Sequence, residues 1–214
     1  MHRAELLIFD LDGTLIDSKR DIANSVNLCF KDMGLPEKSH ELIYTYVGNG
    51  VRQLIIDALG SDDPELIDRA LGCFEQHYLS HLLDETRLFP GMAEVLQHFE
   101  HKKIALVTNK SAHYTEKIIA GLNLAECFDV VFGAGSAMRL KPHPEMLLKT
   151  LDILETQACD AVMIGDSLND IHAAQAAGVR SCGVGYGFGD PQTLKGLNPD
   201  FFIHQSGELM DIFK

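Results

Sequence analysis

The chain contains no run of basic residues, no long apolar stretch and no closely spaced pair of cysteines. Its 214 residues include 18 Lys and Arg against 31 Asp and Glu, which gives a formal net charge of −13. Without a basic run the chain cannot neutralise a row of phosphates, so we expect no nucleic-acid partner. No apolar run approaches the ~20 residues of a membrane-spanning helix, so we expect no membrane association.

The cysteines number five, lie far apart and form no CxxC motif. This usage is typical of reduced thiols in a cytoplasmic protein and not of a disulfide framework. Asp10 and Asp12 interrupt the first apolar run, so the N-terminal segment does not fit a secretory signal. We therefore expect a cytoplasmic protein, whose oligomeric state the sequence does not indicate.

Short apolar runs predict buried strands, and helical patterns lie between the later ones. The runs are continuously apolar and not alternating, as expected of parallel strands covered on both faces. Alternation of strand and helix predicts a doubly wound, Rossmann-like α/β fold. The predicted strands are Glu5–Phe9, Lys103–Val107, Asp129–Phe132, Asp160–Ile164, Ser181–Val184 and Asp200–Ile203, and the helices between the later ones are Ser111–Leu122, Pro144–Leu154 and Asn169–Ala177.

About ninety residues separate the first predicted strand from the second. A crossover between parallel strands needs only about a dozen. Apolar residues in this interval recur at helical spacing and form no strand-like run. We therefore expect a helical cap domain over residues 16–86, inserted into an α/β core domain of residues 1–15 and 87–214. An insertion beside the carboxyl end of a strand is placed to cover a ligand crevice.

Polar side chains follow three of the predicted strands at their carboxyl ends, which share one edge of a parallel sheet. Four of these side chains are aspartates, and a lysine stands nearby in a loop, just before two prolines. The residues are Asp10, Asp12, Thr108, Asn109, Lys141, Asp166 and Asp170.

Four carboxylates gathered at one edge would repel one another. Two of them ~5 Å apart repel by roughly 3 kcal/mol at an effective dielectric of about 20. They would not all stay ionised at neutral pH without a cation. An all-oxygen ligand set without His or Cys favours Mg²⁺. With a hydroxyl and a lysine beside it, this set fits phosphoryl transfer.

The segments FDLDGTLIDS, LVTNK, KPHP and GDSLND resemble, in order and spacing, the four motifs of the haloacid dehalogenase-like hydrolases. The resemblance covers the whole chain, including the helical insertion. Within this superfamily, Val47–Arg52 and Phe89–Gly91 resemble the phosphoglycolate phosphatase group. The resemblance implies a Mg²⁺-dependent phosphatase for small phosphate monoesters, most of all 2-phosphoglycolate, that works through an aspartyl phosphate.

The same resemblance implies the catalytic roles. Asp10 would be the nucleophile, and Asp12 would protonate the leaving oxygen and later deprotonate water. Thr108 and the backbone of Asn109 would hold phosphoryl oxygens. Lys141 would neutralise charge on Asp10 and on the transferring group. Dehalogenases of this superfamily lack the second aspartate, so the presence of Asp12 favours phosphate ester hydrolysis.

It also implies a metal site. Mg²⁺ would bind the Asp10 carboxylate, the Asp12 backbone carbonyl and Asp166, with Asp170 in support behind them. Gly13 would allow the tight turn that puts both aspartates on one side. For Asp170 a second interpretation stays open, because a carboxylate is favourable at any helix N-terminus.

Arg52 is a candidate for substrate specificity. It follows the flexible turn Gly48–Gly50, and its planar guanidinium could pair with a substrate carboxylate such as that of glycolate. In the alternative interpretation Arg52 only solvates the polar face of its helix.

Two further patterns invite a functional interpretation. His77 and His81 stand at i, i+4 and could bind zinc, but the sequence offers no third ligand, so we expect surface or packing residues. The run Gly183–Gly189 lacks the GxGxxG spacing of a dinucleotide site, and we expect a flexible loop.

Other functions stay open at this point. The same chemistry could act on pyrophosphate, a nucleotide or a sugar phosphate. A non-catalytic phosphate-sensing regulator would also use an aspartate, Mg²⁺, a hydroxyl and a lysine. Receiver domains of that kind are much shorter and have no inserted cap, and a sensor has no need of Asp12 as an acid.

Overall fold

The computed structural model describes residues 2–135 and 138–214. In this part of the chain six parallel strands form one sheet in the order β5-β4-β1-β6-β7-β8. The predicted α/β fold is confirmed, and each predicted strand is present. The bounds are β1 Leu6–Phe9, β4 Lys103–Ser111, β5 Val130–Ala134, β6 Ala161–Gly165, β7 Arg180–Val184 and β8 Phe201–Ile203.

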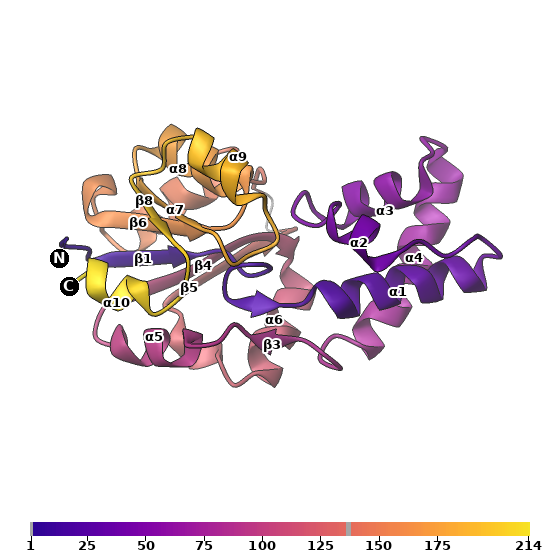
Figure 1. Ribbon diagram of the computed structural model, residues 1–214, viewed down its shortest axis with the longest axis horizontal. Helices are drawn as coiled ribbons and strands as arrows, with labels where there is room; N and C mark the ends of the chain where they lie inside the picture. The colour runs from indigo at the N-terminus through magenta and orange to yellow at the C-terminus, as the bar shows by residue number, and fades with distance from the viewer. Residues whose placement is uncertain (1, 136–137) are drawn as a thin grey trace.

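Helices cover both faces of this sheet (Figure 1). On β1, Leu7 and Phe9 face one apolar core, and Leu6 and Ile8 face the other. Helices α5, α6 and α10 contribute to the first core, and α7 and α8 to the second. The helix bounds are α5 Met92–His98, α6 Ala112–Gly121, α7 Glu145–Ile153, α8 Leu168–Ala177, α9 Pro191–Gly196 and α10 Glu208–Ile212, with 3-10 turns η1 Ala125–Cys127 and η2 Ala158–Asp160.

Helices α1 to α4, which follow β1 in the chain, form a group that lies beside the sheet and is called the helical group below (Figure 1). Helix α4 packs against α1 and α3, and α2 packs against α1. Their apolar stripes are continuous with the first core of the sheet, as Val26, Ile55 and Phe74 illustrate. The predicted helical periodicity is confirmed over α1 Lys19–Asp32, α2 His40–Tyr44, α3 Val51–Leu59 and α4 Pro64–Ser80.

A short antiparallel ribbon stands where the chain enters and leaves this group of helices. Strand β2 (Ile16–Asp17) pairs with β3 (Arg87–Leu88). The expectation that this interval holds no strand is wrong here, because two residues are too few to show an apolar pattern. Beside the ribbon, the buried carboxylate of Asp21 accepts hydrogen bonds from the Thr86 amide and hydroxyl, each at 2.8 Å. These bonds and the ribbon hold together the two segments that connect the sheet to the group of helices.

No helix among the described residues is both long enough and apolar enough to cross a bilayer.

Candidate active site

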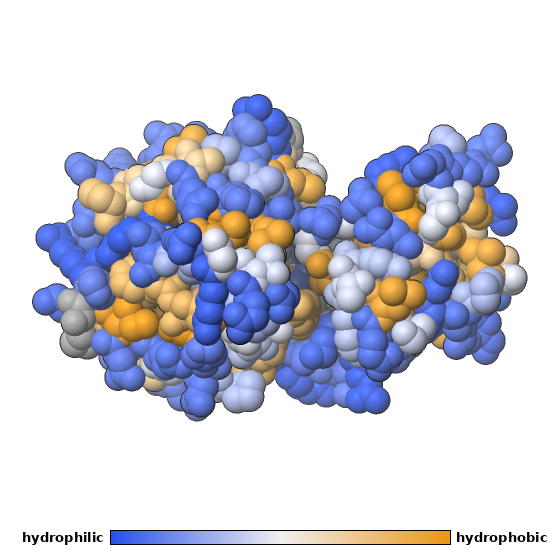
Figure 2. All heavy atoms as spheres, turned by 45° about the horizontal axis from the view of Figure 1, so that its top comes forward, coloured by the Kyte–Doolittle hydropathy of each residue, from blue (hydrophilic) through white to orange (hydrophobic). Residues whose placement is uncertain are grey.

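The carboxyl ends of β4, β1 and β6 stand side by side, with β1 between the other two. The chain runs outward from β1 to β5 and then crosses to β6, which makes this edge the switch point where open α/β sheets bind ligands. A cavity of about 490 Å³ lies here, lined by residues of the strand ends and of helices α1, α3 and α4. Figure 2 shows the surface hollowed between these two parts of the molecule.

Lys141 brings two of the predicted aspartates together. Its ammonium lies 2.9 Å from Asp10 Oδ1 and 2.6 Å from Asp170 Oδ1, and it donates to the Val107 carbonyl at 2.7 Å. The lysine is only 3% exposed, so these contacts replace water almost completely. A buried ammonium is tolerated when its protons are paired in this way.

Asp166 completes a cluster of buried carboxylates. Oxygens of Asp10, Asp166 and Asp170 all lie within 4.8 Å of one another. Burial, together with the charges of Asp10 and Asp170, raises the pKa of Asp166 to about 8. Burial also raises the pKa of Asp10 to about 6, against the lowering effect of Lys141. The cluster therefore holds more negative charge than its protein surroundings stabilise.

The donor set fits a hard divalent cation. Three carboxylates against the single ammonium of Lys141 leave two uncompensated negative charges. Asp10 Oδ1 is buried and has no hydrogen-bond partner with proper geometry, although it is ion-paired with Lys141. Both oxygens of Asp170 are engaged, one by Lys141 and the other by the amide and hydroxyl of Ser167. Asp166 Oδ2 accepts from two amides, but its Oδ1 accepts a longer bond of 3.3 Å from the Thr14 hydroxyl. Asp10 Oδ1 and Asp166 Oδ1 are thus the carboxylate oxygens best placed to hold a metal, with Asp170 behind them.

Asp170 satisfies both interpretations that the sequence left open. It is the third residue of α8 and forms a capping box with Ser167, so it stabilises the start of that helix. It also pairs with Lys141 and belongs to the carboxylate cluster.

The backbone at Gly13 and Gly187 lies so close to the Asp166 side chain that no larger residue fits there. A Cβ on Gly13, whose φ is +83°, would lie 2.1 Å from Asp166 Oδ2, and one on Gly187 would lie 2.3 Å from Asp166 Cβ. The amides of Phe188 and Gly189 donate to Asp166 Oδ2 at 2.7 and 3.3 Å. The predicted loop Gly183–Gly189 begins later than expected, because Gly183 lies within β7, and residues 185–189 form a loop that wraps this carboxylate. The repeated glycines were its signal in the sequence.

Thr108 and Asn109 stand at the predicted edge, within β4. Thr108 is buried, lines the cavity and accepts a hydrogen bond from the Lys110 amide. Asn109 accepts from the Lys141 amide and donates to the Lys141 carbonyl, both at 2.8 Å. This pair of bonds sets the position of the Lys141 backbone.

Asp12 lies apart from the carboxylate cluster and has a lysine of its own. Lys110 Nζ lies 3.1 and 3.0 Å from the two Asp12 oxygens and 2.6 Å from the Tyr78 hydroxyl. The Ser18 hydroxyl also donates to Asp12. The sequence places Lys110 beside Thr108 and Asn109 at the end of a predicted strand but indicates no role for it, and it does not single out Tyr78. Lys110 ends the LVTNK motif, which was its signal, whereas Tyr78 had only the helical periodicity of its segment.

One loop of the helical group reaches the strand ends. Asn169 Nδ2 donates to Asn49 Oδ1 at 2.8 Å and to the Gly48 carbonyl at 3.3 Å. Asn109 donates to the same Gly48 carbonyl at 3.2 Å. Two amide side chains of the sheet edge thus hold residues 48–49 over the cavity.

The structure does not bring Arg52 to this site. Its guanidinium lies 3.0 Å from Asp68 of α4, and the two side chains are 58% and 68% exposed. Gly50, Val51 and Leu54 line the cavity, whereas Arg52 does not. The geometry matches the alternative in which Arg52 solvates its helix.

Fold and site together define an α/β enzyme with a buried carboxylate and lysine centre at the carboxyl edge of its sheet. The chain belongs to the haloacid dehalogenase-like hydrolases, whose family model matches residues 7–184.

Several relatives carry the same name. The chain is 35% identical over 213 residues to a phosphoglycolate phosphatase of Chromobacterium violaceum, with 96% of this chain and 95% of the relative covered. It is 36% identical over 217 residues to one of Psychrobacter arcticus, with 97% and 94% covered. A crystal structure described as a predicted phosphoglycolate phosphatase from Haemophilus somnus matches with a TM-score of 0.94 at 28% identity, covering 99% of each chain.

Proposed function

We propose that the protein is a Mg²⁺-dependent phosphatase of small phosphate monoesters, with 2-phosphoglycolate as its favoured substrate. The observation that carries this proposal is the buried cluster of Asp10, Asp166 and Asp170 around Lys141, with a second carboxylate, Asp12, nearby. The shared name of the relatives supports the choice of substrate.

Asp10 is the nucleophile in this proposal. A carboxylate oxygen of Asp10 attacks phosphorus while the bond from phosphorus to the leaving oxygen breaks. Asp12 gives its proton to that oxygen, and the alcohol departs. A water molecule then attacks phosphorus of the aspartyl phosphate and loses a proton to Asp12. The bond to Asp10 breaks, and inorganic phosphate leaves.

The surrounding groups stabilise charge. Lys141 neutralises Asp10 and the transferring phosphoryl group, and Thr108 with the backbone of Asn109 binds phosphoryl oxygens. Asp10, Asp166 and the Asp12 carbonyl would hold Mg²⁺, with Asp170 behind them. When bound, Mg²⁺ neutralises phosphoryl charge and orients the substrate.

The helical group is the cap in this proposal, over residues 16–86, on a core of residues 1–15 and 87–214. It supplies apolar walls to the cavity, among them Ile22, Leu54 and Phe74. Closure of such a segment excludes water and selects the leaving group. The hydrogen bonds from Asn109 and Asn169 to residues 48–49 would hold the closed state.

The test is kcat/KM with Mg²⁺ across phosphate monoesters and pyrophosphate, with the Asp10→Asn protein as the blank. A preference for 2-phosphoglycolate of a hundredfold, about 2.7 kcal/mol of differential transition-state binding, would support both chemistry and substrate. A flat profile, or a preference for pyrophosphate, a nucleotide or a sugar phosphate, would overturn the substrate. No turnover of any ester would overturn the enzyme and favour a phosphate-sensing regulator.

A further inference from the structure

Lys110 is placed between the sheet edge and the helical group. It lies in β4 and is 9% exposed, and its three ammonium protons match three acceptors, the two Asp12 oxygens and the Tyr78 hydroxyl. A saturated, buried ammonium has one orientation, and it fixes the carboxylate that it binds.

Tyr78 brings the helical group into this arrangement. It belongs to α4, is 1% exposed, stacks on Phe74 of the same helix and meets Tyr114 of α6 edge-on, with ring centroids 5.1 Å apart in both pairs. Ser18, which donates to Asp12, precedes α1. Two partners of the Asp12–Lys110 pair therefore belong to the helical group and not to the sheet.

We propose that Lys110 and Tyr78 are positioning residues for Asp12, and that they aim its carboxyl group at the leaving oxygen only when the helical group is seated on the sheet. The proposal rests on the proposed function. It assigns to the helical group a part in proton transfer, in addition to a part in shaping the cavity.

A competing role for Lys110 is to bind an anionic group of the substrate. Among the described residues that line the cavity, Lys110 carries the one cationic Lys or Arg side chain. The two roles differ in what they change. Loss of a substrate contact raises KM for carboxylate-bearing substrates, whereas loss of an aimed acid lowers turnover of esters whose leaving group needs a proton.

The experiment uses the leaving group as the probe. 2-Phosphoglycolate releases an alkoxide that must be protonated, whereas 4-nitrophenyl phosphate releases a stable phenolate. We expect Lys110→Met to lower kcat at least about 50-fold for the alkyl ester and less than about fivefold for the aryl ester, with KM for the alkyl ester little changed, because acid catalysis is worth about 10²–10⁴-fold. Tyr78→Phe should change the two substrates in the same direction by a smaller factor, and Asp12→Asn should show the same pattern most strongly.

The alternatives give distinct results. Equal losses on both esters, or a rise in KM confined to the carboxylate-bearing substrate, would overturn the positioning role. If Lys110→Met does not fold, the test uses Tyr78→Phe and Lys110→Arg instead. Lys110→Arg keeps a cation beside Asp12, so we expect it to retain part of the unmodified protein's turnover of the alkyl ester. An unmodified protein that hydrolyses neither ester would instead overturn the proposed function.

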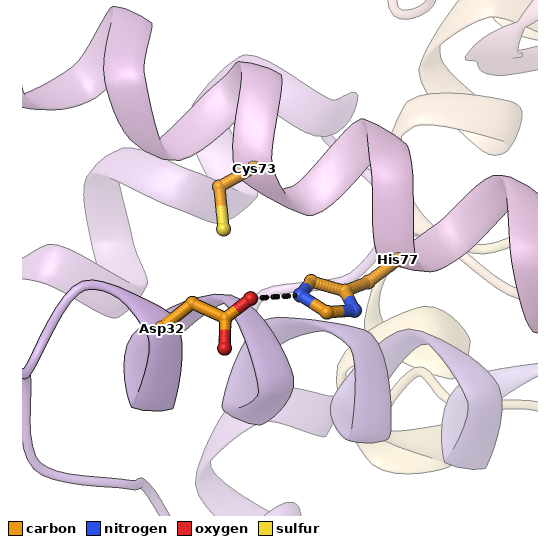
Figure 3. A group of neighbouring side chains, drawn as sticks. All are labelled: Asp32, Cys73 and His77. Atoms are coloured by element: carbon orange, nitrogen blue, oxygen red, sulfur yellow. Dashed lines mark hydrogen bonds and ion pairs between the residues drawn. The ribbon is translucent and has the colours of Figure 1, made fainter.

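A separate group of side chains lies away from the cavity, between α1 and α4. Asp32 ends α1, and Cys73 and His77 stand one turn apart on α4 and face it (Figure 3). One ligand atom of each lies within 4.8 Å of the others, and His77 Nε2 is 2.8 Å from Asp32 Oδ2. His81 pairs instead with Asp84 and lies outside this group.

The structure supplies for His77 the further ligands that the sequence did not show. Imidazole, thiolate and carboxylate together form a ligand set typical of zinc and unlike the all-oxygen cluster at the sheet edge. The three side chains are half-buried or exposed, so an ion has access and a water molecule can fill a fourth position. We infer that Asp32, Cys73 and His77 bind a zinc-type divalent ion that ties α1 to α4.

Cobalt titration in excess Mg²⁺ tests this site. We expect one Co²⁺ per chain with a thiolate-to-cobalt charge-transfer band. The described residues form two clusters of possible metal ligands, and only the one at Cys73 contains a thiol. Cys73→Ser and His77→Gln should lose the band, whereas the control Cys159→Ser, at an exposed thiol elsewhere, should keep it. Zn²⁺ should raise Tm in the unmodified protein and not in Cys73→Ser. No band, or a band kept in Cys73→Ser, would overturn the inference.

Discussion

The sheet edge and the helical group meet at one cavity but are built differently. At the sheet edge, Lys141, Asp166 and Asp170 are each at most 3% exposed, and each is held by groups from other segments. The loop of residues 48–49 is exposed, and among the described residues it is held to the sheet edge by amide hydrogen bonds from Asn109 and Asn169. The difference teaches that groups held at several buried points fix the carboxylate and lysine centre in the sheet, whereas the exposed loop of residues 48–49 can part from it at small energetic cost.

Asp10→Asn would break the rigid side most completely. The amide cannot form an aspartyl phosphate, so we expect turnover to fall by at least about 10⁴-fold. The chain should fold normally, because the change removes one of three mutually repelling carboxylates. Turnover measured with Mg²⁺ checks the first point and Tm checks the second. A residual rate above one hundredth of the original would contradict Asp10 as nucleophile.

Lys141→Met tests how far the rigid side depends on its one ammonium. The change leaves Asp10 and Asp170 buried without their cation, and we expect a loss of about 3 kcal/mol in the free energy of unfolding. The matched control is Lys149→Met, which breaks an exposed pair with Asp152 and should cost less than about 1 kcal/mol. Urea unfolding of both variants gives the comparison. Equal losses would show that burial of Lys141 has no special weight.

The pH dependence of metal-free protein should report the same crowding. Folded pKa values of about 6 for Asp10 and about 8 for Asp166 lie above the ordinary value of 3.8. The folded state therefore binds more protons than the unfolded state between these values, and stability falls as pH rises from about 4 to about 8. Mg²⁺ should offset this loss, so its effect on Tm should be larger at pH 8 than at pH 5. An effect that does not vary with pH would contradict the carboxylate cluster as the metal site.

Asn169→Ala sharpens the comparison from the helical side. It removes two hydrogen bonds to residues 48–49, each worth about 1 kcal/mol, and leaves the carboxylate cluster untouched. We expect KM to rise by a factor of about 3–10 while kcat changes little. The control is Gln175→Ala, which lies on α8 like Asn169 and loses one hydrogen bond to the Leu197 carbonyl. A fall in kcat alone would place Asn169 with the chemistry.

Arg52→Ala should have the smallest effect. Its ion pair with Asp68 is exposed, and such pairs contribute about 0–1 kcal/mol. We expect KM for 2-phosphoglycolate to stay within twofold and Tm to change little. A larger rise in KM would show that Arg52 reaches the substrate in a closed state and would restore the role that its place in the sequence suggests.

The strands and the sheet-edge residues could be predicted because their signals are local. Continuous apolar runs mark buried parallel strands, and the polar groups at their ends follow from the sheet alone. Helices α5, α9 and α10 and strands β2 and β3 have too few residues for a periodic pattern. Lys110 was missed for another reason. Its partners Asp12 and Tyr78 are 98 and 32 residues away in sequence, so only the folded chain shows the group.

The ribbon of β2 and β3 determines how readily one helical group can be replaced by another at this position in the chain. Paired strands lie about 4.8 Å apart, so the two ends of the helical group leave the sheet as neighbours, as the ends of a tight turn do. Closing a loop costs only about 0.6 kcal/mol more for each doubling of its length. Helical groups of very different size can therefore be exchanged at this position while the sheet and its carboxylates stay as they are. A group transplanted here would also have to supply its own hydroxyl for Lys110.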